Sequence, residues 1–154
     1  MKDIKVLIIC VSVHQGNTFK IAKAMSESLD AKIVEPESIS LEELINYDLI
    51  GFGSGIYNQK HHQRIFDFIT KLPTQNHKKA FIFSTNTFGL KKLNEPLKSK
   101  LVEKGFTIVG EFSCPGFINY GLIKYLFGGL NKNRPNNNDL INVQEFSKKM
   151  LSNL

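Results

Sequence analysis

The chain has 154 residues, of which 42% are hydrophobic and 22% are charged. This length predicts one domain, residues 1–154, that buries a core of its own, and the composition excludes a disordered protein. No apolar run approaches the ~18 residues of a membrane-spanning helix, and the run that begins at Ile4 is too short for a signal peptide. Cys10 and Cys114 form no Cys-x-x-Cys pair, so neither a zinc ribbon nor a disulfide scaffold is expected, and the cytoplasm is the predicted compartment.

The net charge is +6, from 20 Lys and Arg against 14 Asp and Glu. The excess falls in residues 60–104, which carry 10 basic and 3 acidic residues, whereas residues 1–59 carry 5 basic and 8 acidic residues. A basic protein invites comparison with nucleic-acid binders. This chain, however, has no basic tail and no basic run interleaved with aromatic residues. Lysines on solvated helix faces are therefore the leading explanation of the charge, and no nucleic-acid partner is expected.

Alternating strand and helix patterns run along the whole chain. Five apolar runs predict strands over residues 4–11, 31–35, 48–53, 80–84 and 106–112, the second of them weak and typical of an edge strand. Apolar residues at helical spacing predict helices over residues 18–29, 65–72, 90–101 and 140–154, with a short crossing piece near residues 41–45 and a helix stop at Gly105. This alternation predicts an α/β fold, a three-layer doubly wound sheet of five parallel strands.

One segment, residues 115–138, fits no regular element and is rich in Gly, Pro and aromatic residues. A connection this long is usually functional or partly ordered. We expect residues 122–127 to form a helical turn or an added strand.

The ends of the predicted strands are the candidate binding positions, because ligands of open parallel sheets bind beyond the carboxyl ends of the strands. After the first strand, Ser12, Asn17 and Thr18 offer hydroxyl and amide groups, and Gly16 allows close approach of the backbone. The predicted helix that follows presents free N–H groups and a positive dipole end. These are the components of a phosphate cradle.

Spacing excludes several other phosphate-binding sites at this position. Asn17 follows Gly16, so the lysine of a Walker loop is missing. The Gly-x-Gly-x-x-Gly turn of dinucleotide-binding proteins is missing as well, since Gly16 is the only glycine after the first strand. A small tyrosine phosphatase with Cys10 as nucleophile would need an arginine at position 16, and a receiver domain would need an aspartate where Gly53 and Ser54 stand. The remaining candidate is a site that holds a monophosphate through uncharged hydrogen-bond donors.

The segment Ser12-Val13-His14-Gln15-Gly16-Asn17-Thr18 resembles the phosphate loop of the flavodoxin family, in which the pattern is roughly Ser/Thr-x-Thr-Gly-x-Thr. The segments at residues 53–57 and 84–89 resemble the two flavin-ring loops of that family, and the order of elements matches over the whole length. The chain departs from the pattern at His14-Gln15, which adds a residue before the glycine. Its basic charge also differs from that of acidic electron-carrier flavodoxins.

The resemblance implies a sheet of order 2-1-3-4-5 that binds one FMN, with the isoalloxazine ring between the loops at residues 54–58 and 85–89. Tyr57 is the first candidate to stack on the ring and Phe88 the second, while Gly55 would allow a backbone change near the flavin N5. The implied cofactor-binding residues are Ser12, His14, Gly16, Asn17, Thr18, Ser54, Gly55, Ile56, Tyr57, Asn58, Thr85, Asn86, Thr87, Phe88 and Gly89.

Other titratable residues have ordinary explanations. His61 and His62 are adjacent, and adjacent histidines on a helix point in different directions, so no metal site is expected. Cys10 is expected in the core, and Cys114 either packs or faces the flavin region. Nothing in the sequence resembles a Ser-His-Asp or Cys-His catalytic set.

Three functions remain open at this point. An FMN-binding electron carrier would dock redox partner proteins, and the basic residues favour acidic ones. An FMN-dependent NAD(P)H or quinone oxidoreductase would use Lys91, Lys92 or Lys124 for a nucleotide phosphate. The aromatic loop from Phe117 to Phe127 would form the pocket for its second substrate. A flavodoxin-like binding module without enzymatic activity is the third. The oligomeric state, monomer or homodimer, is left open, and no membrane partner is expected.

Overall fold

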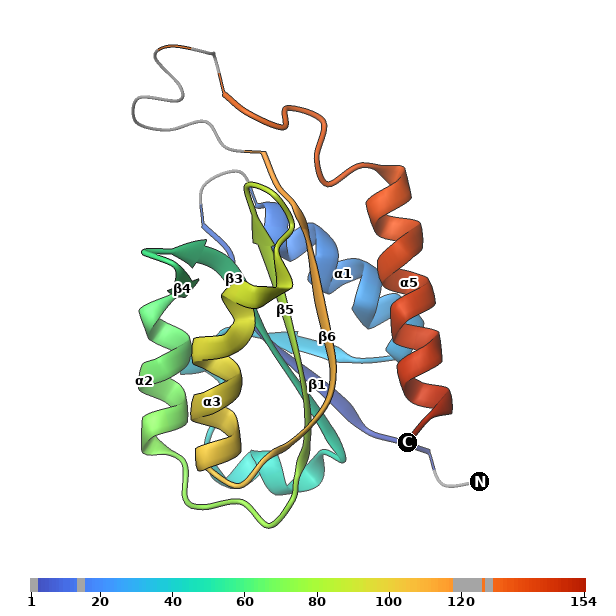
Figure 1. Ribbon diagram of the computed structural model, residues 1–154. Coiled ribbons are helices and arrows are strands. Elements are labelled where there is room, and N and C mark those ends of the chain that lie inside the picture. Colours follow the sequence, from blue (N-terminus) through green and yellow to red (C-terminus); the bar gives the residue numbers. More distant parts are fainter. Residues whose placement is uncertain (1–2, 14–15, 118–125, 127–128) are drawn as a thin grey trace.

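The computed structural model of the protein describes residues 3–13, 16–117, 126 and 129–154. It contains a parallel sheet of five strands in the order β2-β1-β3-β5-β6, with a short strand β4 that pairs antiparallel with β3 (Figure 1). Counted along the chain, the five parallel strands have the order 2-1-3-4-5. The predicted doubly wound α/β architecture is therefore confirmed, and β4 is an element that the sequence pattern did not show.

The strands are β1 Val6–Val11, β2 Lys32–Val34, β3 Leu49–Tyr57, β4 Lys60–His61, β5 Lys79–Asn86 and β6 Thr107–Pro115. The α-helices are α1 Asn17–Leu29, α2 Gln63–Lys71, α3 Glu95–Glu103 and α5 Asn137–Ser152. The 3₁₀-helices are η1 Pro36–Ser38, η2 Glu42–Asn46 and η3 Lys91–Asn94.

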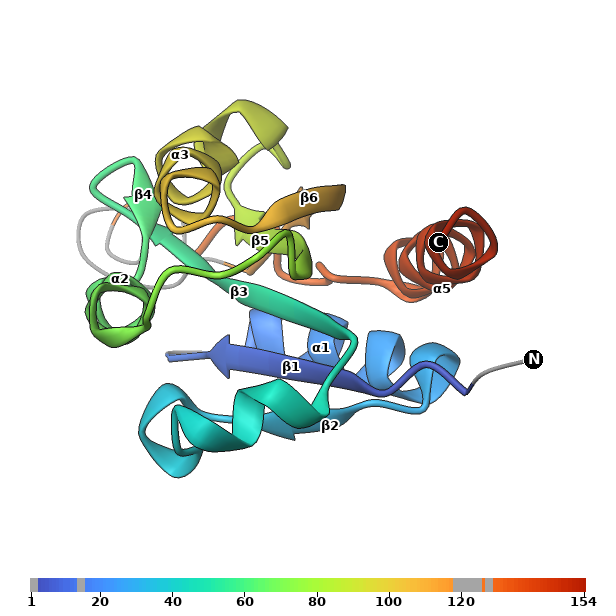
Figure 2. The same ribbon diagram turned by 90° about the horizontal axis from the view of Figure 1, so that it is seen from below.

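Helices cover both faces of the sheet, as Figure 2 shows along the strands. Helices α1 and α5 lie on one face, and α2 and α3 lie on the other. Strand β1 is buried throughout, and its side chains alternate between two cores. Leu7 and Ile9 pack with Ile65 of α2, while Ile8 packs with Met25 of α1. The continuous apolar run of β1 is thus the pattern of a strand covered on both sides.

Glycines of β3 lie beside phenylalanines of β5. Gly51 pairs with Phe81, and Gly53 pairs with Phe83. A Cβ atom built on either glycine would overlap the phenylalanine ring beside it. Both rings belong to the core under α1 and α5. Glycine is therefore required at these two positions because the rings occupy the space of a side chain.

Several element boundaries differ from the sequence prediction. β3 continues to Tyr57 and β5 to Asn86, so residues predicted to lie in ring loops are in strands. The predicted helix over residues 90–101 divides into η3 and α3, and the crossing piece near residues 41–45 is the 3₁₀-helix η2. Gly105 ends α3 as expected, with φ +97° and Gln75 so close that a side chain would not fit.

The two edges of the sheet are unlike. β2 has three residues, and β6 has nine, most of them half-buried. β6 pairs with β5 through a register shift at Ala80 and Phe81. On β6, the Glu111 carboxylate accepts a hydrogen bond from Lys98 Nζ of α3 at 3.2 Å. None of the helices formed by the described residues is long and apolar enough to span a membrane.

Candidate functional site

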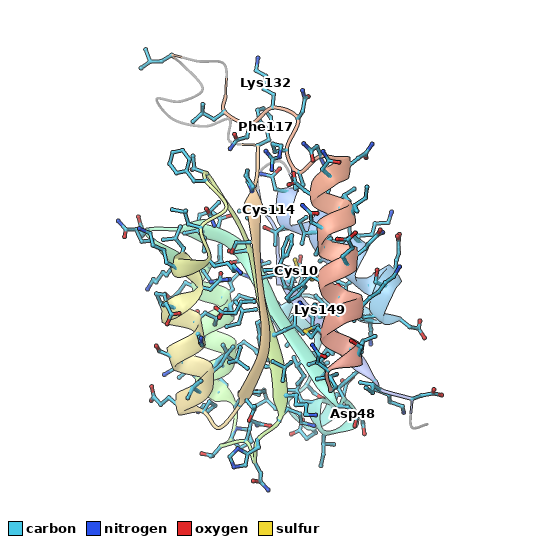
Figure 3. All side chains as sticks on the ribbon, turned by 45° about the vertical axis from the view of Figure 1, so that its right-hand side comes forward. Cys10, Asp48, Cys114, Phe117, Lys132 and Lys149 are labelled. Carbon is cyan, nitrogen blue, oxygen red and sulfur yellow. The ribbon has the colours of Figure 1, made fainter. Side chains whose placement is uncertain are left out.

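A cavity of about 510 Å³ lies at the carboxyl ends of the parallel strands. Figure 3 shows this end at the top, where Phe117 follows the end of β6. The cavity is lined by residues from α1, from the ends of β3 and β5, from η3 and from the chain after β6: Val13, Asn17, Thr18, Gly55, Ile56, Tyr57, Gln59, Thr85, Asn86, Thr87, Phe88, Leu90, Lys92, Leu93, Gly116 and Phe117. Its volume is in the range of cofactor pockets.

The cavity opens where the glycine–phenylalanine pairing of β3 and β5 stops. The next pair in the register is Gly55 with Thr85, which carries a small polar side chain. Both residues line the cavity. The three atoms nearest to a Cβ atom on Gly55 would belong to Tyr57, with the hydroxyl 3.1 Å away. The replacement of an aromatic ring by threonine therefore creates the space.

The amino end of α1 forms one wall. Gly16 caps the helix with a left-handed backbone, φ +70°, and nothing lies near the position of a Cβ atom. Ser12 Oγ accepts a hydrogen bond from the N–H of Phe19, in the first turn, at 3.1 Å. Thr18 Oγ1 and Thr85 Oγ1 are 2.8 Å apart and buried, so this hydroxyl pair joins α1 to β5. The N–H groups of this turn and the helix dipole favour an anion.

Asn17 joins the first turn of α1 to the chain beyond β6. Its Nδ2 donates a hydrogen bond to the Phe117 carbonyl at 2.6 Å. Its Oδ1 is buried and has no hydrogen-bond partner among the described residues. A buried acceptor without a donor costs free energy. A ligand with hydroxyl groups in this cavity would remove that cost by donating to Oδ1.

The hairpin of β3 and β4 forms the second wall. Asn58 and Gln59 both have positive φ angles, 50° and 64°, which is the geometry of a two-residue turn whose twist matches the strands. Tyr57 pairs with Lys60 across the hairpin and lines the cavity. Its ring meets the His62 ring edge-on, with centroids 5.2 Å apart. The contact fixes the tyrosine beside the cavity.

Two histidines hold this hairpin in place. His61 is fully buried, and its Nε2 lies 2.9 Å from the Phe83 carbonyl. Burial lowers its pKa to about 4, so the ring is neutral and donates to that carbonyl. His62 Nδ1 accepts from the N–H of Arg64 at the start of α2, and burial lowers its pKa too. The two residues lie in β4 and at the cap of α2, not on one helix as predicted.

The turn after β5 forms the third wall. Asn86 Oδ1 accepts hydrogen bonds from the N–H groups of Phe88 and Leu90, at 3.3 and 2.8 Å. Gly89 has φ +65°, and a Cβ atom there would press on Pro115 at the end of β6. Phe88 lines the cavity but is 75% exposed. An aromatic ring with this exposure at the mouth is available to stack on a ligand.

The described parts of residues 115–138 cross the same end of the sheet. Asn131 Nδ2 donates to the carbonyls of Thr87 and Gly116, at 2.8 and 3.2 Å. The Phe117 N–H donates to the Arg134 carbonyl at 2.8 Å, and Arg134 makes two hydrogen bonds to the Asp139 carboxylate. The predicted turn or strand at residues 122–127 lies outside the described residues apart from Leu126.

The predicted site residues divide into groups. Nine of them line the cavity: Asn17, Thr18, Gly55, Ile56, Tyr57, Thr85, Asn86, Thr87 and Phe88. Ser12 and Gly16 line a second cavity of about 480 Å³, next to Glu35 and on the other side of the amino end of α1. Asn58 and Gly89 shape the neighbouring turns, and His14 lies outside the described residues.

Ser54 has a structural position. It is fully buried, and its hydroxyl accepts from the N–H of His62 at 2.8 Å and donates to the Gly55 carbonyl at 2.6 Å. In a strand, Ser54 faces away from the side of Gly55. Its hydroxyl therefore anchors the start of α2 to β3.

Sequence reasoning missed several cavity residues, namely Val13, Gln59, Leu90, Leu93 and Gly116. A Cβ atom on Gly116 would press on the Asn17 side chain. This close approach joins positions 99 residues apart, which a motif search cannot detect. Lys92 and Phe117, considered as a phosphate contact and as part of a substrate pocket, do line the cavity, whereas Lys124 lies outside the described residues.

Neither cysteine is placed for redox chemistry. Cys114 is 3% exposed in the core under α1 and α5, and burial raises its pKa to about 12. Burial also raises the pKa of Cys10 to about 12. Both thiols are therefore neutral packing groups. The described residues contain no group of three His, Cys, Asp or Glu side chains that could hold a metal ion.

Comparisons with known proteins agree with this geometry. The model of the flavodoxin domain family matches residues 7–120. The chain belongs to this family. It is 50% identical over 151 residues to an uncharacterized protein of Methanocaldococcus jannaschii, an alignment that covers 97% of this chain and 99% of the other.

Solved structures resemble the fold over its whole length. A flavodoxin from the domain Archaea has a TM-score of 0.71 and 16% identity, with 97% of this chain and 98% of that one covered. A Fusobacterium nucleatum flavodoxin bound to flavin mononucleotide has a TM-score of 0.67 and 15% identity, with 98% and 99% covered. At these identities, the likeness establishes the fold.

Proposed function

We propose that the protein binds one FMN in the cavity at the carboxyl ends of β1, β3 and β5 and acts in electron transfer. The observation that carries the proposal is the meeting of three features in one cavity: the amino end of α1, an unsatisfied buried amide oxygen and two aromatic side chains. The family and the flavin-bound structural relative support the same cofactor.

The chemistry of the cavity fits each part of FMN. The first turn of α1 offers N–H groups and the Thr18 hydroxyl to a phosphate, with the helix dipole as the positive charge. Asn17 Oδ1, which is buried without a donor, would accept a hydrogen bond from a hydroxyl of the ribityl chain. Tyr57 and Phe88 offer ring faces to the isoalloxazine, in the offset or edge-on geometry that aromatic rings prefer. When bound, the flavin supplies the one- and two-electron redox chemistry that the side chains of the cavity lack.

The protein's part in electron transfer is to hold the cofactor in a fixed position and to set its potential. Tyr57 is held by His62, and Thr85 is held by Thr18, so two contacts to the cofactor are fixed before binding. Fixed contacts lower the entropy cost of binding. An electron-rich tyrosine face favours the oxidised flavin over the anionic reduced one, which lowers the potential.

A second function has a specific observation in its favour. Lys92 and Phe117 line the cavity together, so a cation and an aromatic ring stand where NAD(P)H or a quinone would enter. An FMN-dependent oxidoreductase would use the same cavity with the flavin at its base. We place the carrier first because the solved structures that resemble the chain over its whole length include flavodoxins.

The decisive experiment is purification followed by anaerobic reduction. We expect a yellow protein with about one FMN per chain, and no prompt bleaching by NADH or NADPH. Prompt bleaching would establish the oxidoreductase instead. A colourless protein that added FMN cannot reconstitute would eliminate both functions and leave a binding module without flavin.

Tyr57→Ala tests the ring contact directly. Loss of an aromatic pair costs about 1 kcal/mol beyond the area buried, so FMN affinity falls roughly five- to tenfold and the flavin potential rises. Spectroelectrochemical titration and fluorescence quenching measure the two effects. Tyr57→Phe, the matched control, keeps the ring and should keep both values near those of the native protein.

We further propose a cytoplasmic location with redox proteins as partners. Both cysteines are free and buried, as suits a reducing compartment. A thiol titration of the protein in denaturant, after isolation under conditions that trap thiols, should count two free thiols per chain. A disulfide bond at either cysteine would contradict this location.

A further inference from the structure

The second cavity, of about 480 Å³, is formed by the ends of β1 and β2 and by the first turn of α1. β2 is the edge strand of the sheet and lies beside β1 (Figure 2). The lining residues that could meet a ligand are Ser12, Gly16, Phe19, Ile33 and Glu35, and none of them lines the first cavity. The volume is in the range of ligand pockets, and the flavin proposed above does not account for it.

Glu35 places a carboxylate at the end of β2. It directly follows the last residue of that strand, and its side chain is 64% exposed. Arg64 Nη2 of α2 donates a hydrogen bond to Glu35 Oε2 at 2.9 Å, whereas Oε1 accepts none within the part of the chain that the structure describes. A carboxylate accepts hydrogen bonds from hydroxyl groups, and an acidic side chain at this strand end binds ribose hydroxyls in dinucleotide-binding sheets. Oε1 is therefore available to the hydroxyls of a ribose.

Phe19 gives the same cavity an aromatic wall. Its side chain is 49% exposed, although it belongs to the first turn of α1. The N–H of Phe19 donates to Ser12 Oγ at 3.1 Å, so the backbone that carries the ring is held beside the cavity. Ile33 of β2 adds a half-buried aliphatic side chain. An exposed ring next to an aliphatic group offers an apolar face on which a purine base can stack.

Gly16 separates the two cavities. It lines the second cavity, while Asn17 and Thr18, the next two residues, line the first. Its φ is +70°, and no atom lies within 4 Å of the position that a Cβ atom would take. The three-glycine turn of other dinucleotide sites is absent, so close approach of phosphates depends on this one glycine. Phosphate groups can therefore cross the amino end of α1 at Gly16, over the N–H groups of the first turn.

We propose that the second cavity is a nucleoside subsite that takes the adenosine half of FAD, an inference that rests on the proposed flavin site in the first cavity. The flavin half occupies the first cavity, and the two phosphates cross α1 at Gly16. Glu35 accepts hydrogen bonds from the ribose hydroxyls of the adenosine, and Phe19 packs against the adenine. The chain accordingly accepts FAD as well as FMN.

Charge and connectivity favour FAD over a separate nicotinamide nucleotide. Both cavities share one first turn of α1, so a second nucleotide would compete with the flavin phosphate for the same N–H groups. Arg64 is held by Glu35 and by Glu37, whose Oε1 accepts from Arg64 Nε at 2.7 Å. Two carboxylates against one guanidinium leave a net negative charge, which repels the 2′-phosphate of NADPH.

The test compares the affinities of the flavin-free chain for FMN and FAD, measured by fluorescence titration. Glu35→Gln removes the carboxylate charge, and Phe19→Ala removes the aromatic wall. Glu37→Gln is the matched control, because Glu37 bonds the same arginine and lines neither cavity. Amide chemical shifts of Ile33 and Val34, two β2 residues that line the second cavity, report its occupation.

We expect the native chain to bind FAD at least as tightly as FMN, with shifts at Ile33 and Val34 for FAD and not for FMN. Glu35→Gln and Phe19→Ala should each weaken FAD binding roughly five- to tenfold and leave FMN binding within about twofold. Glu37→Gln should change neither affinity.

Weaker binding of FAD than of FMN, or equal losses for the two flavins in Glu35→Gln and Phe19→Ala, would overturn the subsite and leave the proposed function intact. Shifts at Ile33 and Val34 when NADH is added to the FMN-loaded chain, together with weaker binding of FAD than of FMN, would assign the cavity to a separate nucleotide instead. AMP is the probe that separates the two proposals. AMP that shifts Ile33 and Val34 in a chain that binds neither flavin would retain the nucleoside subsite and reject the proposed function.

Discussion

Glycine recurs at every second position of β3, at Gly51, Gly53 and Gly55, but the two halves of the strand have different neighbours across the sheet. In the first half, Gly51 and Gly53 lie under the rings of Phe81 and Phe83, so that part of the sheet is closed. In the second half, Gly55 lies beside Thr85, and beyond it the strand turns into a hairpin with β4. The first half is core and the second half lines the cavity. The difference comes from the residue across the sheet, because the glycines themselves are alike.

The replacement Thr85→Phe should have the largest effect, because it extends the row of rings over Gly55. A third ring fills the part of the cavity assigned to the flavin. FMN affinity should fall at least ~100-fold, equivalent to about 2.7 kcal/mol, while the protein stays folded. Fluorescence titration with FMN measures the affinity, and circular dichroism checks the fold. Thr85→Ser, which keeps the hydroxyl next to Thr18, is the control. Native affinity in Thr85→Phe would show that the flavin does not bind there.

The matched pair Gly51→Ala and Gly55→Ala should separate stability from binding. A methyl group on Gly51 meets the Phe81 ring, and such overpacking costs about 1–3 kcal/mol of unfolding free energy. The atoms nearest to a methyl group on Gly55 belong to Tyr57 at 3.1–3.4 Å, so the ring has to move by only a few tenths of an ångström within its contact with His62. The free energy of unfolding should then change by less than about 1 kcal/mol. Urea denaturation measures both, and equal losses in the two variants would refute the contrast.

Acid should lower the free energy of unfolding through His61, which pairs with Ile56 in the second half of β3. Burial lowers its pKa in the folded protein to about 4 from the ordinary value of 6.5, so between these values the unfolded chain binds a proton that the folded chain does not. Above pH 6.5, His61 is neutral in both states and its titration does not change the free energy of unfolding. As the pH drops from 6.5 towards 4, the free energy of unfolding falls. At pH 5 the loss is about 1–2 kcal/mol. His61→Gln should have a flatter profile between pH 7 and 5 in urea denaturation. Parallel profiles would remove His61 as the cause.

The smallest expected effect is that of Lys92→Gln on the flavin potential. An exposed charge at the mouth is worth about 0.5 kcal/mol, equivalent to about 10 mV for a two-electron couple. The positive charge favours the anionic reduced flavin, so its removal should lower the potential. Spectroelectrochemistry at low salt measures the shift, with Lys149→Gln as control. A rise in the potential would contradict the assignment of Lys92 to the mouth.

The sequence predicted the sheet correctly because its central strands carry unmistakable signals. The apolar run of β1 and the alternation with helical stripes define a doubly wound sheet without any knowledge of contacts. The first turn of α1 was also recognisable, since a glycine followed by Asn17 and Thr18 at a strand end is a local pattern. These features depend on neighbours in sequence.

The remainder depends on register and on distant contacts. Glycine and serine in residues 53–55 are typical of a loop, yet β3 continues because Phe83 and Thr85 pair across it. The turn at Asn58 and Gln59 lacks the glycine that usually marks a two-residue hairpin. The contacts of Asn131 span 44 and 15 residues and leave no local signature.

The register shift between β5 and β6 has a consequence for behaviour at high concentration. β6 is a nine-residue edge strand, and edge strands present backbone groups to which another chain can pair. The irregularity near Phe81 and the inward carboxylate of Glu111, which faces Lys98, make this edge a poor template for such pairing. Both features disfavour the pairing of β6 with a second copy of the chain.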